Sequence, residues 1–208
     1  MRHRRRGRKL GRSPAHQRAL LRNLAASLFL TVETDDLAGN GPKVNGRIVT
    51  TLPKAKEVRP LVEKCITIAR NTLKDQEEAD RLATTAARNT EVWRQWRESE
   101  QWHQWAAAIA PVVAARRRAL QLLGDKKAVR LLFSDVAPRF ADRPGGYTRV
   151  LRLAKPRLGD AGTRAILELV GVRDRVVQRA PKPAFDQAPK SDDAQGEPVT
   201  AASGAAGQ

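Results

Sequence analysis

Residues 51–70 of the chain read TLPKAKEVRPLVEKCITIAR. Thr51, two residues before Pro53, is a candidate helix N-cap, because its side chain can accept a bond from a free amide at the start of a helix. Apolar residues then recur with helical spacing through the rest of the stretch, which predicts a helix with one buried face. Pro60 lies inside this pattern, and we expect it to kink or divide the helix.

Cys65 lies on the apolar side of this predicted helix and is the only cysteine of the chain. A single cysteine excludes an intrachain disulfide and any cysteine-rich metal site. We therefore expect a small buried hydrophobe and not a nucleophile. The three histidines, His3, His16 and His103, are too scattered for a metal motif, so no metal site is predicted.

A second helix is predicted upstream, because Ser13 and Pro14 form a helix-start signal. From residue 15 to about residue 30, four leucines fall on one side of a helical repeat, whereas Arg18 and Arg22 share another side. One face of this helix should pack in the core, and the other should present cations.

Four stretches have the composition and alternation of strands. Phe29–Thr34 and Gly46–Thr51 are predicted to pair across a long exposed loop, and Tyr147–Leu153 and Arg164–Val170 are predicted to form an antiparallel hairpin. Together with the helices, these strands predict a two-layer α+β fold, in which helices pack on a small, mostly antiparallel sheet.

The stretch from about residue 75 to residue 124 is rich in Ala, Arg, Glu and Gln and contains all four tryptophans of the chain. We expect one or two helices here, with a break at Pro111. On one continuous helix, Trp93 and Trp96 would face away from Trp102 and Trp105, so we favour helix packing over stacking on nucleobases. Asp125 should cap one last helix, which Pro138 ends.

The charge of the chain points to a polyanionic partner. Lysine and arginine number 39 against 22 acidic residues, giving a formal charge of +17 at pH 7. Residues 1–12 are an Arg-dense arm that we expect to be disordered until a partner neutralises it, and residues 173–208 are a predicted disordered tail. Residues 13–172 should form a single domain that includes the Trp-rich insertion at about 75–124.

Several function classes lack the residues that they need. No apolar run is long enough to span a membrane, and no secretion signal precedes the domain, so we expect a cytoplasmic protein. The chain shows no phosphate-binding loop, nucleophile elbow or metalloprotease motif, so we expect no enzyme, cofactor or small-molecule substrate. An architectural DNA-binding protein and an RNA-modifying enzyme are the alternatives, but groove-reading motifs and a cofactor site are missing from the sequence.

A second basic feature is DRPGGYTRVLR at residues 142–152. Its two glycines allow close backbone approach, and arginines surround Tyr147. Taken alone, these residues fit an RNA contact and an ordinary tight turn with a half-buried tyrosine equally well.

Six segments together resemble a known family, ribosomal protein seventeen of the bacterial large subunit. They are MRHRRRGRKLGR (1–12), HQRALLRNLAASL (16–28), TTLPKAKEVRPLVEKCITIAR (50–70), KAVRLLF (127–133), PRFADRPGGYTRVLRL (138–153) and AILELV (165–170). The resemblance implies an α+β protein without catalytic activity that binds ribosomal RNA near the polypeptide tunnel exit, beside other large-subunit proteins.

The resemblance also implies which residues face RNA. The predicted set combines the motif positions with nearby basic residues: Arg2, His3, Arg4, Arg5, Arg6, Gly7, Arg8, Lys9, Arg12, His16, Arg18, Arg22, Asn23, Lys54, Lys56, Arg143, Gly145, Gly146, Tyr147 and Arg149. The chain departs from the family pattern in the loop at 35–45, the Trp-rich insertion and the tail. The insertion could contact peripheral RNA or a neighbouring protein, and the sequence does not choose between them.

Overall fold

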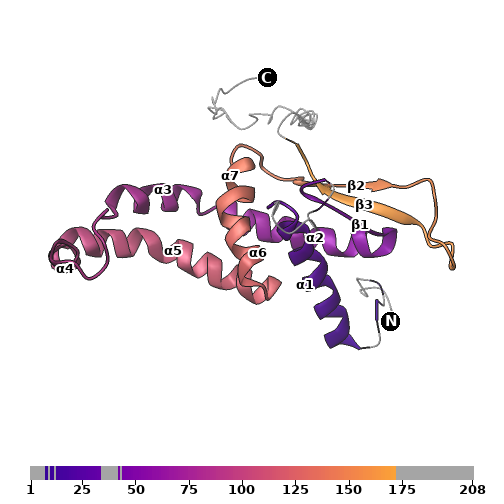
Figure 1. The fold of residues 1–208 in the computed structure, drawn as a ribbon, viewed down its shortest axis with the longest axis horizontal. Helices are drawn as coiled ribbons and strands as arrows, with labels where there is room; N and C mark the ends of the chain where they lie inside the picture. The colour runs from indigo at the N-terminus through magenta and orange to yellow at the C-terminus, as the bar shows by residue number, and fades with distance from the viewer. Residues whose placement is uncertain (1–7, 9, 12, 34–41, 43, 172–208) are drawn as a thin grey trace, which may run out of the picture. The chain divides into compact units, whose positions relative to one another are not determined.

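A computed structural model of the chain describes residues 8, 10–11, 13–33, 42 and 44–171. Most of the predicted disordered arm and the tail at 173–208 lie outside the described residues. Within them the fold is α+β, as predicted, with a three-stranded antiparallel sheet and helices packed on one of its faces (Figure 1). Among the helices that are described, none is both long and apolar enough to cross a membrane.

The first helix, α1 (Pro14–Leu30), begins at the predicted cap, where the Ser13 side chain accepts a bond from the amide of His16 at 3.2 Å. The predicted strand over Phe29–Thr34 is wrong. Phe29 is fully buried on α1, and Thr31 ends the helix, its hydroxyl donating to the carbonyl of Leu28 at 2.6 Å. Core packing of Phe29 therefore outweighs the strand propensity of its neighbours.

The sheet has the strand order β1-β3-β2, formed by β1 (Arg47–Thr51), β2 (Thr148–Arg152) and β3 (Arg164–Leu169). The predicted hairpin is confirmed, because β2 and β3 pair antiparallel. The predicted partner of β1 was wrong, since β1 pairs with β3, where Ile48 lies opposite Leu167. Successive side chains of β3 point to opposite faces of the sheet, so Ala165, Leu167 and Leu169 share the face that packs in the core.

Helix α2 (Leu52–Arg70) follows β1 without a loop and is the centre of the fold. Thr51 takes the predicted cap position, although its side chain makes no capping bond. Pro60 does not divide the helix, and it lies on the exposed side. There water can bond the carbonyl that lacks an amide partner.

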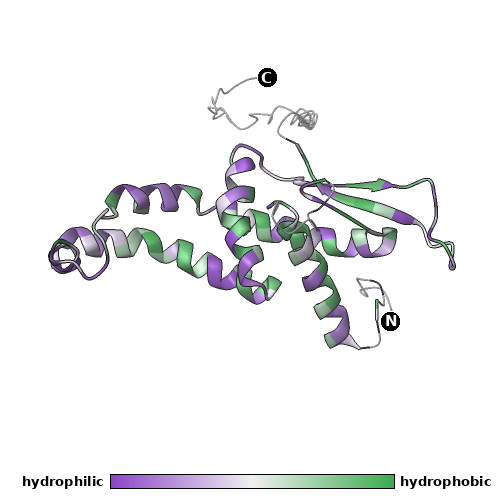
Figure 2. Cartoon of the chain, in the orientation of Figure 1, coloured by the Kyte–Doolittle hydropathy of each residue, from purple (hydrophilic) through white to green (hydrophobic). Residues whose placement is uncertain are grey.

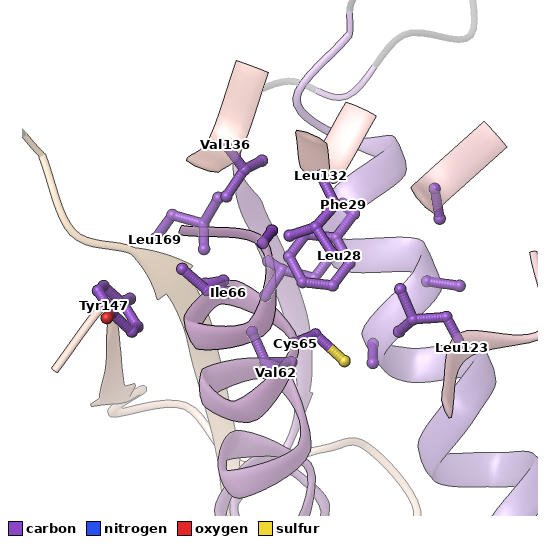
Figure 3. Packing of buried hydrophobic residues seen from close by; sticks show 14 of the residues in the cluster. Leu28, Phe29, Val62, Cys65, Ile66, Leu123, Leu132, Val136, Tyr147 and Leu169 are labelled. Atoms are coloured by element: carbon purple, nitrogen blue, oxygen red, sulfur yellow. The ribbon is translucent and has the colours of Figure 1, made fainter. Parts of the chain in front are cut away.

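The apolar face of α2 is completely covered. Its buried residues are all 0% exposed and occupy successive helical turns: Ala55, Val58, Val62, Cys65, Ile66 and Ala69. α2 packs against all three strands and against α1. In Figure 3, Val62, Cys65 and Ile66 point toward the side chains contributed by the surrounding elements. The prediction that Cys65 is a buried hydrophobe is confirmed.

The Trp-rich insertion consists of three helices, not one or two: α3 (Leu73–Leu82), α4 (Glu91–Glu98) and α5 (Glu100–Leu123). The break expected at Pro111 is absent, because α5 continues through it and ends at Gly124, whose φ is 76°. The chain turns instead at Ser99. α3 and α4 both pack on α5, and the far end of α5 joins the core at Ala119 and Leu123 (Figure 1).

The last helical segment is continuous and passes through α6 (Lys126–Leu131), the π-helical turn η2 (Leu132–Val136) and α7 (Ala137–Arg139). The cap is as predicted, because a carboxylate oxygen of Asp125 accepts from the amides of Lys127 at 2.7 Å and Ala128 at 3.1 Å. The helix ends one residue after Pro138. Leu132 and Val136 enter the core from this segment (Figure 3).

Candidate nucleic-acid interface

Helix α2 connects the two ends of the sheet, and candidate site residues lie at both. At its start, the amide of Leu52 donates to the carbonyl of Thr163, in the turn that joins β2 to β3. Eleven residues later, Glu63 contacts the opposite end of the sheet, where β2 begins. Eleven residues of helix rise about 16 Å at 1.5 Å per residue. The two ends are therefore held apart by a rigid, buried element.

The hairpin-end surface, defined as Arg8, Lys54, Lys56, Arg157 and Arg164, gathers cations around the start of α2. Two hollows lie here, one of about 320 Å³ lined by Lys54, Arg157 and Arg164, and one of about 330 Å³ lined by Arg8 and Lys56. Three of these residues belong to the predicted set. Arg157 and Arg164 were missed, because their place beside Lys54 follows from strand pairing that no local pattern encodes.

Local partners fix part of the hairpin-end surface. The carbonyl of Arg8 accepts from the side chain of Gln17 at 2.7 Å, and the Arg8 Nε atom lies 3.6 Å from a carboxylate oxygen of Glu57. Arg157 pairs with Asp160, and its hydrogen bond holds the pKa of that carboxyl well below the usual range. The negative charge of Asp160 therefore offsets Arg157 at neutral pH, leaving Lys54, Lys56 and Arg164 as the stronger source of positive field.

A hollow of about 930 Å³ lies between α1 and the start of α6. We call it the α1 groove and define it by four residues of its lining: Arg18, Arg22, Asn23 and Lys126. All four side chains are exposed. Arg18 and Arg22 lie one helical turn apart, as predicted, and Lys126 joins them from a segment more than one hundred residues away. The groove therefore presents three cations and one amide side chain to the solvent, and the half-buried carboxylate of Asp125, which caps α6, also lies in its lining.

His16, at the start of α1, lies beside the end of the arm. Gly11 has a φ of 109°, and a side-chain carbon added there would come within 2.1 Å of the His16 imidazole. A glycine is therefore needed at position 11 for two reasons, the left-handed backbone and the close approach of the ring.

The loop at residues 143–149 differs from the other two surfaces, because its tyrosine is not accessible. Tyr147 is 1% exposed, and its ring centroid lies 5.2 Å from that of Phe140. Gly145 and Gly146 are exposed, Gly146 has a φ of 68°, and no atom lies within 4 Å of a side-chain carbon added at either. The surface of this loop is thus open backbone, anchored by a buried ring.

Glu63 and Arg70 of α2 hold this loop, and neither was predicted. One carboxylate oxygen of Glu63 accepts from the amide of Tyr147 at 3.1 Å, and the other accepts from the amide and hydroxyl of Thr148 at 3.0 and 2.6 Å. Arg70 donates to the carbonyl of Arg143 at 2.8 Å. Bonds to a charged group are stronger than neutral ones, so α2 fixes both sides of the loop.

Arg149 lies in a row of charges on the open face of the sheet. Glu168 of β3 accepts from Arg149 at 2.6 and 2.8 Å on one side and from Arg47 at 2.9 Å on the other. Burial raises the pKa of Glu168, but the hydrogen bonds from Arg149 and Arg47 outweigh it, and the net pKa is lowered. The row therefore carries one net positive charge at neutral pH.

The remaining predicted residues are Arg2, His3, Arg4, Arg5, Arg6, Gly7, Lys9 and Arg12, and they lie outside the described part of the chain. In the described part, no three acidic, histidine or cysteine side chains are grouped as a metal site would require. Burial raises the pKa of the Cys65 thiol to about 12, so it stays protonated at neutral pH. A thiol in that state is a poor nucleophile.

The described residues thus form a small α+β fold with exposed cations along α1 and around the start of its central helix, which places the chain among small, strongly basic proteins. Comparison with known proteins gives a closer identification. A model of the family described as ribosomal protein L17 matches residues 20–170. The chain belongs to this family of ribosomal structural proteins, which is not known as an enzyme family. The resemblance found in the sequence is confirmed.

Individual relatives cover most of the chain. A protein of Rhodopirellula baltica, named large ribosomal subunit protein bL17, is 64% identical over 195 residues, which are 93% of this chain and 93% of the relative. A protein of the same name from Halothermothrix orenii is 36% identical over 163 residues, covering 78% of this chain and 96% of the relative.

Proposed function

We propose that this chain is a structural constituent of the large ribosomal subunit and that it binds ribosomal RNA without catalysing a reaction. Its partners are then ribosomal RNA and neighbouring large-subunit proteins, its location is the cytoplasmic ribosome, and its place is near the exit of the polypeptide tunnel. The observation that carries the proposal is the family match over residues 20–170, which includes the 143–149 loop and, apart from Arg18, the residues that define the α1 groove.

The cations of the α1 groove and the hairpin-end surface support RNA phosphates as the ligand. Arg18 and Arg22 present planar guanidinium groups, which bond phosphate oxygens in pairs. Each phosphate that they neutralise releases counterions, so affinity falls steeply as salt rises. The Arg-rich arm at residues 1–12 adds charge that can follow the irregular phosphate path of folded RNA.

The 143–149 loop has a different role in this proposal. Gly145 and Gly146 leave room for a sugar-phosphate backbone to approach the protein backbone closely. Tyr147 acts from beneath, because its buried ring packs the loop against Phe140. Glu63 and Arg70 hold the loop in one conformation before RNA arrives, which lowers the entropy lost on binding.

Sedimentation of native lysate under rising salt tests the assignment. The protein should follow the large subunit in equal number and resist moderate salt. Arg18→Gln with Arg22→Gln should release it at lower salt, because two phosphate contacts are lost. Arg117→Gln with Arg118→Gln, the same charge change at exposed positions of α5 outside the groove, is the matched control and should leave retention unchanged. A protein that runs free, or that binds simple DNA duplexes equally well, contradicts the proposal.

The position near the tunnel exit has its own test. Ribosomes stalled with nascent chains of increasing length, each with a photoreactive residue near its N-terminus, should form an adduct with this protein only once the nascent chain is long enough to reach the exit. Adducts with shorter chains, or none at any length, would place the protein elsewhere on the subunit.

A further inference from the structure

The tip of the insertion has a surface that the proposed function does not use. Residues 73–105, which comprise α3, α4 and the start of α5, contain seven acidic and five basic residues, in a chain whose formal charge is +17. Figure 2 shows α3 mostly in the hydrophilic colour. Glu77, Glu78 and Asp80 of α3 are all exposed. This part of the molecule therefore lacks the excess of cations that would draw it to RNA phosphates.

All four tryptophans of the chain meet at this tip. On one continuous helix the two pairs would face opposite sides, but the turn at Ser99 separates α4 from α5 and brings them together. Trp93, Trp96, Trp102 and Trp105 are each half-buried and line one hollow of about 420 Å³. Arg88 and Arg97 also belong to its lining, so the carboxylates of the tip lie outside the hollow. Their gathering confirms helix packing as one role, since the rings of Trp96 and Trp105 lie 5.5 Å apart in an edge-on arrangement.

The hollow is not sealed by this packing. Val92, the residue before Trp93 on α4, is 63% exposed. The indole nitrogen of Trp96 is buried with no hydrogen-bond acceptor among the described residues. Half-exposed tryptophans next to an exposed apolar side chain are typical of protein interfaces, where they carry much of the binding energy.

Two features oppose RNA as the occupant. A nucleobase would need a free tryptophan face, but the Arg97 guanidinium lies over both Trp93, at 5.2 Å, and Trp102, at 5.8 Å. A phosphate chain would also run past the exposed carboxylates of α3, which repel it. A polypeptide that places an apolar side chain in the hollow and its lysine or arginine side chains outside it meets neither obstacle, because the exposed carboxylates of α3 attract those cations.

We propose that the acidic-aromatic tip, defined as residues 73–105, docks a basic segment of a neighbouring protein and does not bind RNA. The inference rests on the proposed function, since a ribosomal subunit supplies basic neighbours, and it names the partner class for the insertion. An apolar side chain of the partner occupies the tryptophan hollow, and its basic side chains lie against Glu77, Glu78 and Asp80.

Tryptophan fluorescence of the full chain reads this tip alone, because no tryptophan lies elsewhere. Oligouridylate that carries a fluorescent label should bind the purified protein, which raises the fluorescence anisotropy of the label. The tryptophan emission should stay unchanged. Quenching that follows the same binding curve would place bases on the rings and overturn the inference.

The partner is identified in the assembled particle. A photoreactive residue at position 92 should give an adduct in purified large subunits that protease removes and ribonuclease does not. Mass spectrometry should locate it in a lysine- and arginine-rich segment of one protein. Glu77→Lys with Glu78→Lys should reduce the adduct at least tenfold. Asp135→Lys with Asp142→Lys, an equal charge change at exposed sites outside the tip, should not.

The outcomes separate the two proposals. An RNA adduct, no adduct, or an adduct that ignores the charge reversal on α3 overturns the docking inference while the protein still sediments with the large subunit. Failure to sediment with the subunit overturns the proposed function itself.

Discussion

Helix α2 buries six side chains completely, whereas α4 buries none, although both are amphipathic. α2 is held by packing against strands and helices on every side of its apolar face. α4 is held by its cap at Thr90 and by the tryptophan contacts of the tip. An amphipathic pattern therefore predicts a helix but does not determine how deeply that helix is buried. Damage to α2 should unfold the domain, and damage to α4 should open only the tip.

The largest contrast between the two helices should be in thiol reactivity. Cys65 on α2 has a pKa raised to about 12 by burial, so little thiolate forms at pH 8. Alkylation by iodoacetamide should be on the order of a thousandfold slower than for a cysteine with an ordinary pKa. Val92→Cys in a Cys65→Ala background supplies that reference on α4. Comparable rates at the two positions would mean that the core around α2 opens as readily as the tip.

Stability should show the next largest contrast. Ile66→Ala leaves a cavity between α2 and the core, and we expect it to lower the free energy of unfolding by about 2–5 kcal/mol. Val92→Ala on α4 removes an exposed side chain and should change it by less than about 0.5 kcal/mol. Urea denaturation followed by circular dichroism measures both. Equal losses would refute the division into a core helix and a surface helix.

A substitution in the sheet that covers α2 should have a smaller effect on the free energy of unfolding, and this effect should depend on pH. Glu168→Gln keeps the side-chain shape but weakens the bonds from Arg47 and Arg149, and should cost about 1 kcal/mol at pH 7, since both arginines are partly exposed. The folded pKa of Glu168 is lowered, so its contribution is complete above the unfolded value of about 4.3 and is lost as pH falls through the folded value.

Urea titrations of the native protein and Glu168→Gln between pH 3 and pH 7 test this sign. The two stabilities should converge below about pH 4, as the native carboxylate takes up its proton. A gap that stays constant over this range would show that the Glu168 charge does not stabilise the sheet.

Features that are determined by residues close together in the sequence could be predicted, and features that depend on distant contacts could not. The caps at Ser13 and Asp125, the apolar face of α2 and the β2-β3 hairpin are set by residues close in sequence, and all were predicted correctly. The strand at Phe29–Thr34 was wrong, because burial of Phe29 in the core decides its conformation.

The sites depended even more on distant contacts. Motifs indicated the cations of the α1 groove, but Lys126 joins Arg22 only through packing of α1 near α6. The role of Glu63 was not visible, because the Tyr147 amide that it accepts from lies 84 residues away. Helix packing of the tryptophans was predicted, but their meeting in one place was not, because the turn at Ser99 was not foreseen.

Removal of the N-terminal cap of α4 should have the smallest effect of these changes. Thr90 caps α4 by accepting from the amide of Trp93 at 3.3 Å, and Thr90→Ala removes this bond. Loss of such a cap costs about 1 kcal/mol of local helix stability. Because α4 has no buried residue to couple it to the core, hydrogen exchange at the amides of Trp93 and Arg94 should quicken about fivefold, while the urea midpoint of the domain stays unchanged. A lowered midpoint would show instead that the tip and the core unfold as one unit, and α4 would then support the fold as α2 does.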